Sequence, residues 1–173
     1  YWSPNGLPVC TAVNTQSTFV MEKYGQYGAV ICWQDFRASA DADLYAQRFD
    51  IWGNMLWASD GIGICTYYKW QTGQQIIEDG YGNIIFAWSD PRDVDQDFYV
   101  QKVSPDGVPQ WEADGRLFLH EYYQRGYLSM VPDEAGGAYM AWVDQRDYQT
   151  TGYDIYATRL DGTGYWGYPA PVV

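Results

Sequence analysis

Three pairs of a carboxylate and a guanidinium recur along the chain, and side chains of these two kinds can serve in catalysis or bind sugars. Each pair belongs to a Trp-x-Asp-x-Arg motif, and the copies comprise Trp33, Asp35 and Arg37; Trp88, Asp90 and Arg92; and Trp142, Asp144 and Arg146. A residue that returns at the same place in every repeat usually serves the repeat itself. We therefore expect these pairs to be structural ties.

An acidic loop follows the middle motif and could bind calcium. It carries Asp90, Asp93, Asp95 and Asp97, and Ca²⁺ takes several oxygen ligands. The other two copies carry fewer carboxylates, and no copy has the Gly and terminal Glu of an EF-hand. We favour a solvated loop, with calcium as the alternative and no other cofactor.

Aromatic side chains form a third candidate site. Tyr67, Tyr68 and Trp70 are close together in the second copy, and Tyr122 and Tyr123 lie at related positions in the third. Such rings could stack on sugars, or pack against a neighbouring repeat or subunit, because aromatic residues are enriched at protein interfaces. We favour packing and keep carbohydrate binding as the alternative.

The other reactive side chains indicate no catalytic site. His120 stands where the other copies have threonine, and no second His or Cys has metal-ligand spacing. We expect it to be a half-exposed strand residue. Cys10, Cys32 and Cys65 are expected to be small buried apolar residues, with a Cys10–Cys32 disulfide as the less favoured alternative.

The spacing of these motifs defines a repeat that runs through the whole chain. The motif tryptophans Trp33, Trp88 and Trp142 are 55 and 54 residues apart. A second series has steps of 55, 54 and 55 residues and comprises Trp2, Trp57, Trp111 and Trp166. Such a period is typical of repeat architectures.

Each repeat is predicted to consist of β-strands. Val, Ile, Tyr, Trp and Phe cluster in short runs, Asp-Gly and Asn-Gly pairs punctuate them, and no stretch has helical periodicity. In the second copy we expect strands near 73–78, 83–89, 97–103 and 108–119, the last with a break. Roughly four strands in about 54 residues make one propeller blade. The predicted fold is therefore all-β, with three four-stranded blades of the β-propeller type.

The repeat phase predicts a single repeat domain, 1–173, with complementary half-blades at its ends. Residues 1–23 would supply the later strands of a split blade and 133–173 its early strands, with complete repeats at 24–78 and 79–132. Propellers typically have 4 to 8 blades. Two chains could therefore build a ring, the chain could belong to a longer propeller, or subunits could join head to tail by strand complementation. Unpaired strand edges favour self-assembly.

Composition limits the expected partners. The 173 residues include 22 acidic and 10 basic side chains, with a formal net charge of −12, which disfavours nucleic acid and anionic membranes. No apolar run is long enough for a membrane-spanning helix. The aromatic content of 18% and the few Lys and Arg residues suit an extracellular β protein. The chain begins with Tyr, and we expect a processed chain or part of a longer one.

The repeat resembles β-propeller-like repeats of large secreted bacterial proteins. The second copy carries most of the likeness, in Asp79-Gly80-Tyr81-Gly82, in Ala87 to Arg92, in Asp97-Phe98-Tyr99, and in Gly107 and Trp111. Ser104-Pro105-Asp106-Gly107 with Trp111 also faintly resembles the sialidase Asp-box, which implies a blade turn. The resemblance implies a propeller fold and an extracellular setting, and it implies no reaction.

These observations favour a non-enzymatic, extracellular, structural or adhesive protein that associates with itself or with the other blades of a longer chain. A carbohydrate-binding propeller is the alternative, and a glycoside hydrolase comes third. A lectin should expose its aromatic residues to solvent on loops, whereas an assembly protein should bury them at contacts.

Overall fold

The computed structural model describes residues 2–38, 40–93, 96–120 and 126–166, and these form three antiparallel sheets without a helix. The first sheet has the order β1-β2-β3-β4, with strands Gln16–Tyr24, Gly28–Asp35, Asp43–Asp50 and Ile62–Cys65. The second has the order β5-β6-β7-β8, with strands Thr72–Glu78, Ile84–Asp90, Asp97–Val103 and Arg116–Leu119. The third has the order β9-β10-β11, with strands Gly126–Pro132, Ala138–Asp144 and Asp154–Leu160. The all-β prediction is confirmed, and β5 to β8 lie where strands were expected.

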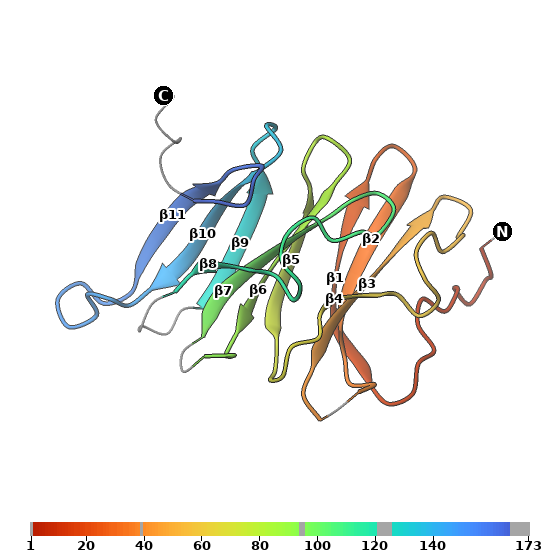
Figure 1. The fold of residues 1–173 in the computed structure, drawn as a ribbon, viewed down its shortest axis with the longest axis horizontal. Helices are drawn as coiled ribbons and strands as arrows, with labels where there is room; N and C mark the ends of the chain where they lie inside the picture. Colours follow the sequence, from red (N-terminus) through yellow and green to blue (C-terminus); the bar gives the residue numbers. More distant parts are fainter. Residues whose placement is uncertain (1, 39, 94–95, 121–125, 167–173) are drawn as a thin grey trace.

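The three sheets stand side by side in chain order, from the first sheet to the third (Figure 1). Their first strands face one another in series, because β1 contacts β5 and β5 contacts β9. The third sheet has three strands among the described residues. Within the described parts of the chain, no helix is long and apolar enough to cross a membrane.

Hairpin register explains why the repeated motif has two halves. Trp88 lies directly opposite Tyr99, and Asp90 lies opposite Asp97, in the β6–β7 hairpin. The other two copies keep this register, with Trp33 opposite Tyr45 and Trp142 opposite Tyr156. The loop between the strands therefore changes length without changing which residues pair.

Two hydrophobic cores join the three sheets. The core between the first and second sheets includes Leu44, Ile64, Phe86 and Trp88. The core between the second and third sheets includes Ile85, Phe98, Met140 and Trp142. Every strand residue of β6 and β7 is buried, as expected for a sheet covered on both faces.

The boundaries of the sheets differ from those of the sequence repeat. The repeat boundaries after residues 23, 78 and 132 fall at the turns that join β1 to β2, β5 to β6 and β9 to β10. Residues 16–24 therefore share a sheet with β2. Each structural unit is therefore one sheet. The first unit runs from β1 to β4, which ends at Cys65, and the second runs from β5 to β8, which ends at Leu119.

One alignment made from the sequence is wrong. Trp166 bridges to Leu160, which is the position that Met55 holds opposite Phe49 and Pro109 holds opposite Val103. The turn after each third strand has the same length, because Asp50, Ser104 and Asp161 each donate an amide hydrogen bond four residues ahead. The longer loop before β11 thus places Trp166 two residues earlier in its unit than Trp57 and Trp111.

Candidate functional site

The three Trp-x-Asp-x-Arg motifs form matching polar ties at the ends of β2, β6 and β10. In the middle copy Trp88 Nε1 donates to Asp90 at 3.1 Å, and the Arg92 backbone N–H donates to the same carboxylate at 2.9 Å. The Arg92 guanidinium completes the tie at 2.6 Å. The first and third copies repeat these contacts.

Each arginine also contacts the second half of its motif. Arg37, Arg92 and Arg146 lie over the rings of Tyr45, Tyr99 and Tyr156, at 3.8, 3.7 and 4.1 Å from the ring centroids. This stacking favours the cation electrostatically. The tie therefore connects the turn after one strand to the face of the next strand.

Electrostatics fit a structural role for these carboxylates. Hydrogen bonds from the Arg146 guanidinium are the main cause that lowers the pKa of Asp144 far below its ordinary value. The carboxylate is buried and already accepts from Trp142 and from the Arg146 backbone. An acid held ionised by such partners is poorly suited to give or take a proton near neutral pH.

The pKa of Asp43 is shifted in the opposite direction from those of Asp35 and Asp144. Burial raises the pKa of Asp43 to about 6, and the negative charges of Asp35 and Asp114 act in the same direction. Asp43 lies opposite Asp35 in the β2–β3 hairpin. Raised pKa values occur both in active sites and in structural networks, and its pairing with a tied carboxylate places Asp43 in such a network.

The carboxylates of the acidic loop, which were considered for calcium, differ in their surroundings. Asp90 is engaged in its tie, Asp97 Oδ2 lies 2.8 Å from His120 Nδ1, and Asp93 is exposed; Asp95 lies outside the described residues. Lys69 donates to the backbone carbonyls of the loop at Pro91 and Asp93. Where the chain is described, no three His, Cys, Asp or Glu side chains gather in a way that could hold a metal ion.

The predicted aromatic site is open to solvent. Tyr67, Tyr68 and Trp70 expose 44%, 74% and 49% of their surface. Trp70 meets Phe36 edge to face at 5.6 Å, and the Arg92 guanidinium lies 4.5 Å from the Tyr67 ring centroid. Tyr122 and Tyr123 lie outside the described residues. The second-copy rings thus have the exposure that a ligand platform requires.

Several ion pairs were not predicted from the sequence, and two of them involve buried carboxylates of the second sheet and its turns. His120 was expected to be half-exposed, which it is, but its contact with the buried Asp97 was missed. Lys102 pairs with the buried Asp79 at 2.6 Å and donates to the carbonyl of Gly136, in the turn between β9 and β10, at 2.9 Å. The sequence contained a signal for the Lys102–Asp79 pair, because the third copy has Arg159 and Asp133 at the equivalent positions, and these two also form an ion pair.

Two of the three cysteines are buried as expected, whereas Cys10 is only partly buried. All three thiols are free, and Cys32 and Cys65 are buried. Burial raises the pKa of all three above the ordinary value, which makes a reactive thiolate unfavourable. Cys65 instead accepts a hydrogen bond from Arg92 at 3.3 Å and so joins the first sheet to the tie of the second.

The largest difference between equivalent positions lies on the side of the third sheet that faces away from the second. We name this the third-sheet outer face, and it comprises Val131, Tyr139, Ala141, Ile155 and Ala157. The equivalent residues of the second sheet are all buried in the core toward the third sheet, and they are Ile77, Ile85, Ala87, Phe98 and Val100. Phe98 exposes 1% of its surface, whereas Ile155 exposes 74%.

The opposite end of the stack also carries exposed apolar residues. We name this the first-sheet outer face, and it comprises the exposed Phe19 and Met21, the half-buried Ile31 and the buried Trp33. Phe19 and Met21 expose 67% and 60% of their surface. A hollow of about 190 Å³ opens on this face between Val9, Phe19, Ile31 and Trp33. A further hollow of about 500 Å³ lies near the β1–β2 and β5–β6 turns and is lined by Glu22, Glu78 and Glu134 among others.

Comparison with known proteins adds no family to this description. Neither the scan against protein-family models nor the search of curated proteins found a match. The function is therefore inferred from the two outer faces, the ties and the exposed aromatic residues.

Proposed function

We propose that this protein is a non-enzymatic structural module of the β-propeller-like repeat type, which acts outside the cell and associates with copies of itself. The observation that carries the proposal is the third-sheet outer face. Its five residues are apolar, as are their equivalents in the second sheet, yet Val131, Tyr139 and Ile155 are more than half exposed. Contiguous exposed apolar surface of this kind marks an interaction site.

The polar groups support a structural role. The three carboxylates of the ties are fully buried and bonded to their own motif tryptophan and arginine. Groups repeated in this way stabilise each sheet and its turn. The extracellular setting is supported by the resemblance of the repeat and by its composition.

Strand edges provide a second means of association. Beyond the bridge from Leu160 to Trp166, no strand of the described residues pairs with the outer edge of β11. Unpaired backbone N–H and C=O groups on such an edge favour the addition of a strand. Strand complementation between subunits, in a ring or a filament, would satisfy these groups and cover the apolar face together.

The test is the mass of the protein in solution as a function of concentration. We expect the average mass to rise above the monomer value, and to rise further with salt, because copies with a net charge of −12 repel one another. Ile155→Asp should weaken association roughly 100-fold or more, because burying an unpaired carboxylate costs at least about 3 kcal/mol.

Val108→Asp is the matched control, since Val108 is 54% exposed in the turn after β7. This variant should associate like the wild type. A wild-type protein that stays monomeric at every concentration and salt would rule out the proposed function.

Carbohydrate binding is the second candidate, and the exposure of Tyr67, Tyr68 and Trp70 favours it. Aromatic rings open to solvent can stack on the apolar faces of sugars, and ligand sites often combine such rings with a few polar groups. If this candidate is right, a glycan array will identify a ligand. The double change Tyr68→Ala and Trp70→Ala should then weaken binding at least tenfold, as expected for about 1.4 kcal/mol or more of lost contact.

Tyr81→Ala serves as the control for this experiment, because Tyr81 is also 71% exposed but lies in the β5–β6 turn. Equal loss in the control and the double variant would show that the three rings form no site. The absence of binding to any glycan would remove this candidate and leave self-association as the function.

A further inference from the structure

We infer that two molecules of this protein, here called the first and the second copy of the whole chain, associate through their outer faces. The second copy docks its third-sheet outer face on the first-sheet outer face of the first copy, and its β11 pairs with residues 7–10 of the first copy. This inference rests on the proposed self-association and names its geometry. The contact is head to tail. It repeats between two chains the packing that joins the first sheet to the second, and the second to the third, within one chain.

The N-terminal segment already lies where the last strand of a preceding sheet would lie. Thr11 N–H donates to Asp60 at 2.6 Å. Thr66 directly follows β4, and its backbone N–H donates to Asp114 of the next unit at 2.8 Å. Residues 2–12 therefore contact the first sheet as residues 57–66 contact the second.

Two further contacts of this segment have equivalents one unit later. Cys10 Sγ accepts from Arg37 at 3.3 Å, the same distance as between Cys65 and Arg92. The Trp2 indole N–H donates to the turn carbonyl of Ile51 at 2.6 Å. The Trp57 indole likewise donates to the turn carbonyl of Pro105. The segment is thus positioned as a fourth strand, although none of its residues is in a sheet.

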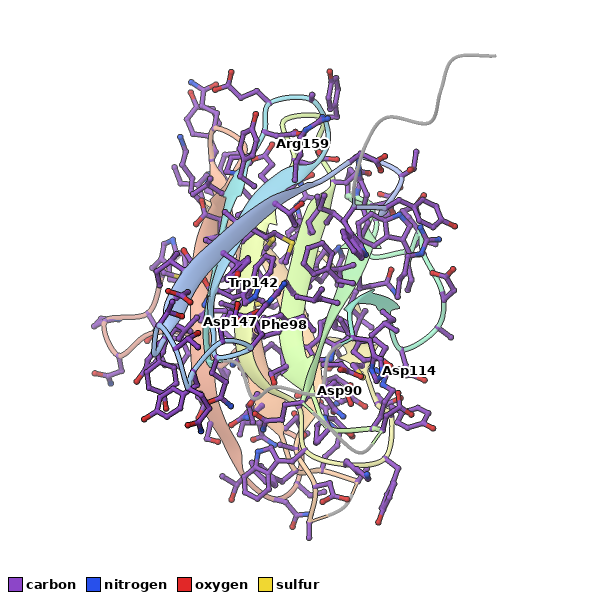
Figure 2. All side chains as sticks on the ribbon, turned by 90° about the vertical axis from the view of Figure 1, so that its left-hand side faces the viewer. Asp90, Phe98, Asp114, Trp142, Asp147 and Arg159 are labelled. Carbon is purple, nitrogen blue, oxygen red and sulfur yellow. The ribbon has the colours of Figure 1, made fainter. Side chains whose placement is uncertain are left out.

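Among the described residues no strand pairs with this segment, and the third sheet offers the equivalents of the strands that precede β4. In the first sheet, β4 is preceded in order by β1, β2 and β3. The third sheet consists of the equivalents of these three strands, β9, β10 and β11, and Figure 2 looks onto its outer side. Docking of a second copy would therefore complete a four-stranded sheet from three strands of one copy and one segment of the other.

The side chains fit this completed sheet. Leu44 and Phe98 occupy equivalent positions at the starts of β3 and β7, and they pack in the cores that contain Trp88 and Trp142 respectively. Ile155 is the next residue in this series. Its side chain would enter the hollow of about 190 Å³ beside Trp33. One water in the liquid occupies about 30 Å³, so the hollow has the volume of several waters and can hold a branched aliphatic side chain.

Gly6 provides an independent observation. A Cβ at Gly61 would lie 2.6 Å from Trp33, and a Cβ at Gly115 would collide with Trp88, whereas a Cβ at Gly6 would meet nothing within 4 Å. Each of the other two glycines packs on the tryptophan of its own sheet. In the docked pair, Gly6 would pack on Trp142 of the second copy.

The register follows from the two existing sheets. Leu44 lies opposite Cys65, and Ala46 lies opposite Ile62; Phe98 lies opposite Leu119 in the same way. The equivalent register places Ile155 of the second copy opposite Cys10 and Ala157 opposite Leu7. Pro8 falls between them on an outermost strand, where a residue without an N–H is tolerated.

Two blocked variants test the head-to-tail arrangement. One carries Tyr139→Asp and Ile155→Asp, and blocks the third-sheet outer face. The other carries Phe19→Asp and Met21→Asp, and blocks the first-sheet outer face. We expect each to be a folded monomer, since all four residues are more than half exposed, and we expect their mixture to form a 1:1 dimer that grows no further.

The outcomes separate the inference from the proposed function. If the wild type associates but the mixture does not, or if one blocked variant still associates alone, the head-to-tail inference is wrong and self-association stands. If the wild type does not associate, the proposed function itself fails. Near-ultraviolet circular dichroism of each variant shows whether it is folded, with Val108→Asp as the folded, associating control.

The register has its own test. Ile155→Cys should form an intermolecular disulfide with the native Cys10 under mild oxidation, because directly opposite residues of antiparallel strands have Cα atoms about 4.5–5.5 Å apart, within the range of about 4.4–6.8 Å that a disulfide spans. Adding Cys10→Ser should abolish the covalent product. Equal cross-linking with and without Cys10 would overturn the register.

Discussion

Asp90→Ala should lower the free energy of unfolding by about 3–5 kcal/mol, the range for removing one partner of a buried ion pair. Asp90 is fully buried, and the Arg92 side chain exposes only 10% of its surface. Without the carboxylate, the guanidinium stays among Tyr99, Cys65 and the backbone of Asp114 with its charge unpaired. Urea unfolding followed by tryptophan fluorescence would measure the loss.

Asp144→Ala should cost less than Asp90→Ala, because the Arg146 side chain is 31% exposed and water can solvate the freed charge. Asp93→Ala is the control, since Asp93 is exposed on the same loop as Asp90. A loss for Asp90→Ala no larger than that for Asp93→Ala would show that the tie does not stabilise the sheet.

Gly115→Ala should lower the free energy of unfolding by about 2–5 kcal/mol. Gly115 has a φ of +87°, and a left-handed conformation costs a residue with a Cβ roughly 1–2 kcal/mol. The new Cβ would also lie 2.6 Å from Cζ2 of Trp88, which is fully buried. Overpacking of this kind costs about 1–3 kcal/mol more.

Gly80→Ala separates the two causes. Gly80 has nearly the same φ, +81°, but a Cβ there would meet nothing within 4 Å. It should therefore show the backbone cost alone, near 1–2 kcal/mol. Equal losses for the two variants would mean that the Trp88 ring moves aside freely, and that the glycine is required only for its backbone conformation.

Experiments can distinguish carbohydrate binding from self-association, because different residues would serve each function. Solvent-facing Tyr68 and Trp70 fit the criterion for a lectin, whereas the apolar residues of the third-sheet outer face fit the criterion for an assembly surface only when a second copy covers them. Tyr68 and Trp70 lie in the loop between β4 and β5, whereas the third-sheet outer face lies on β9 to β11, so variants of one should leave the other intact.

The sequence by itself determined the features that depend on local pairing. The spacing of Trp88, Asp90 and Asp97 predicted a strand, a turn and a second strand. The hairpin has this form, and its register places Asp90 opposite Asp97. Asp-Gly pairs marked turns because both residues accept positive φ, as at Asp114 and Gly115. Strand alternation and turn chemistry act over a few residues, so a short window of sequence contains them.

Contacts between residues far apart in the sequence could be decided only by the tertiary structure. Gly61, for example, packs on Trp33 of the same sheet. Trp166 matched Trp111 in period, yet it pairs at the position of Pro109 because the loop before β11 is longer. Exposure likewise depends on what covers a strand: Phe98 and Ile155 are equivalent in sequence, and only the presence of a following sheet buries one and leaves the other open.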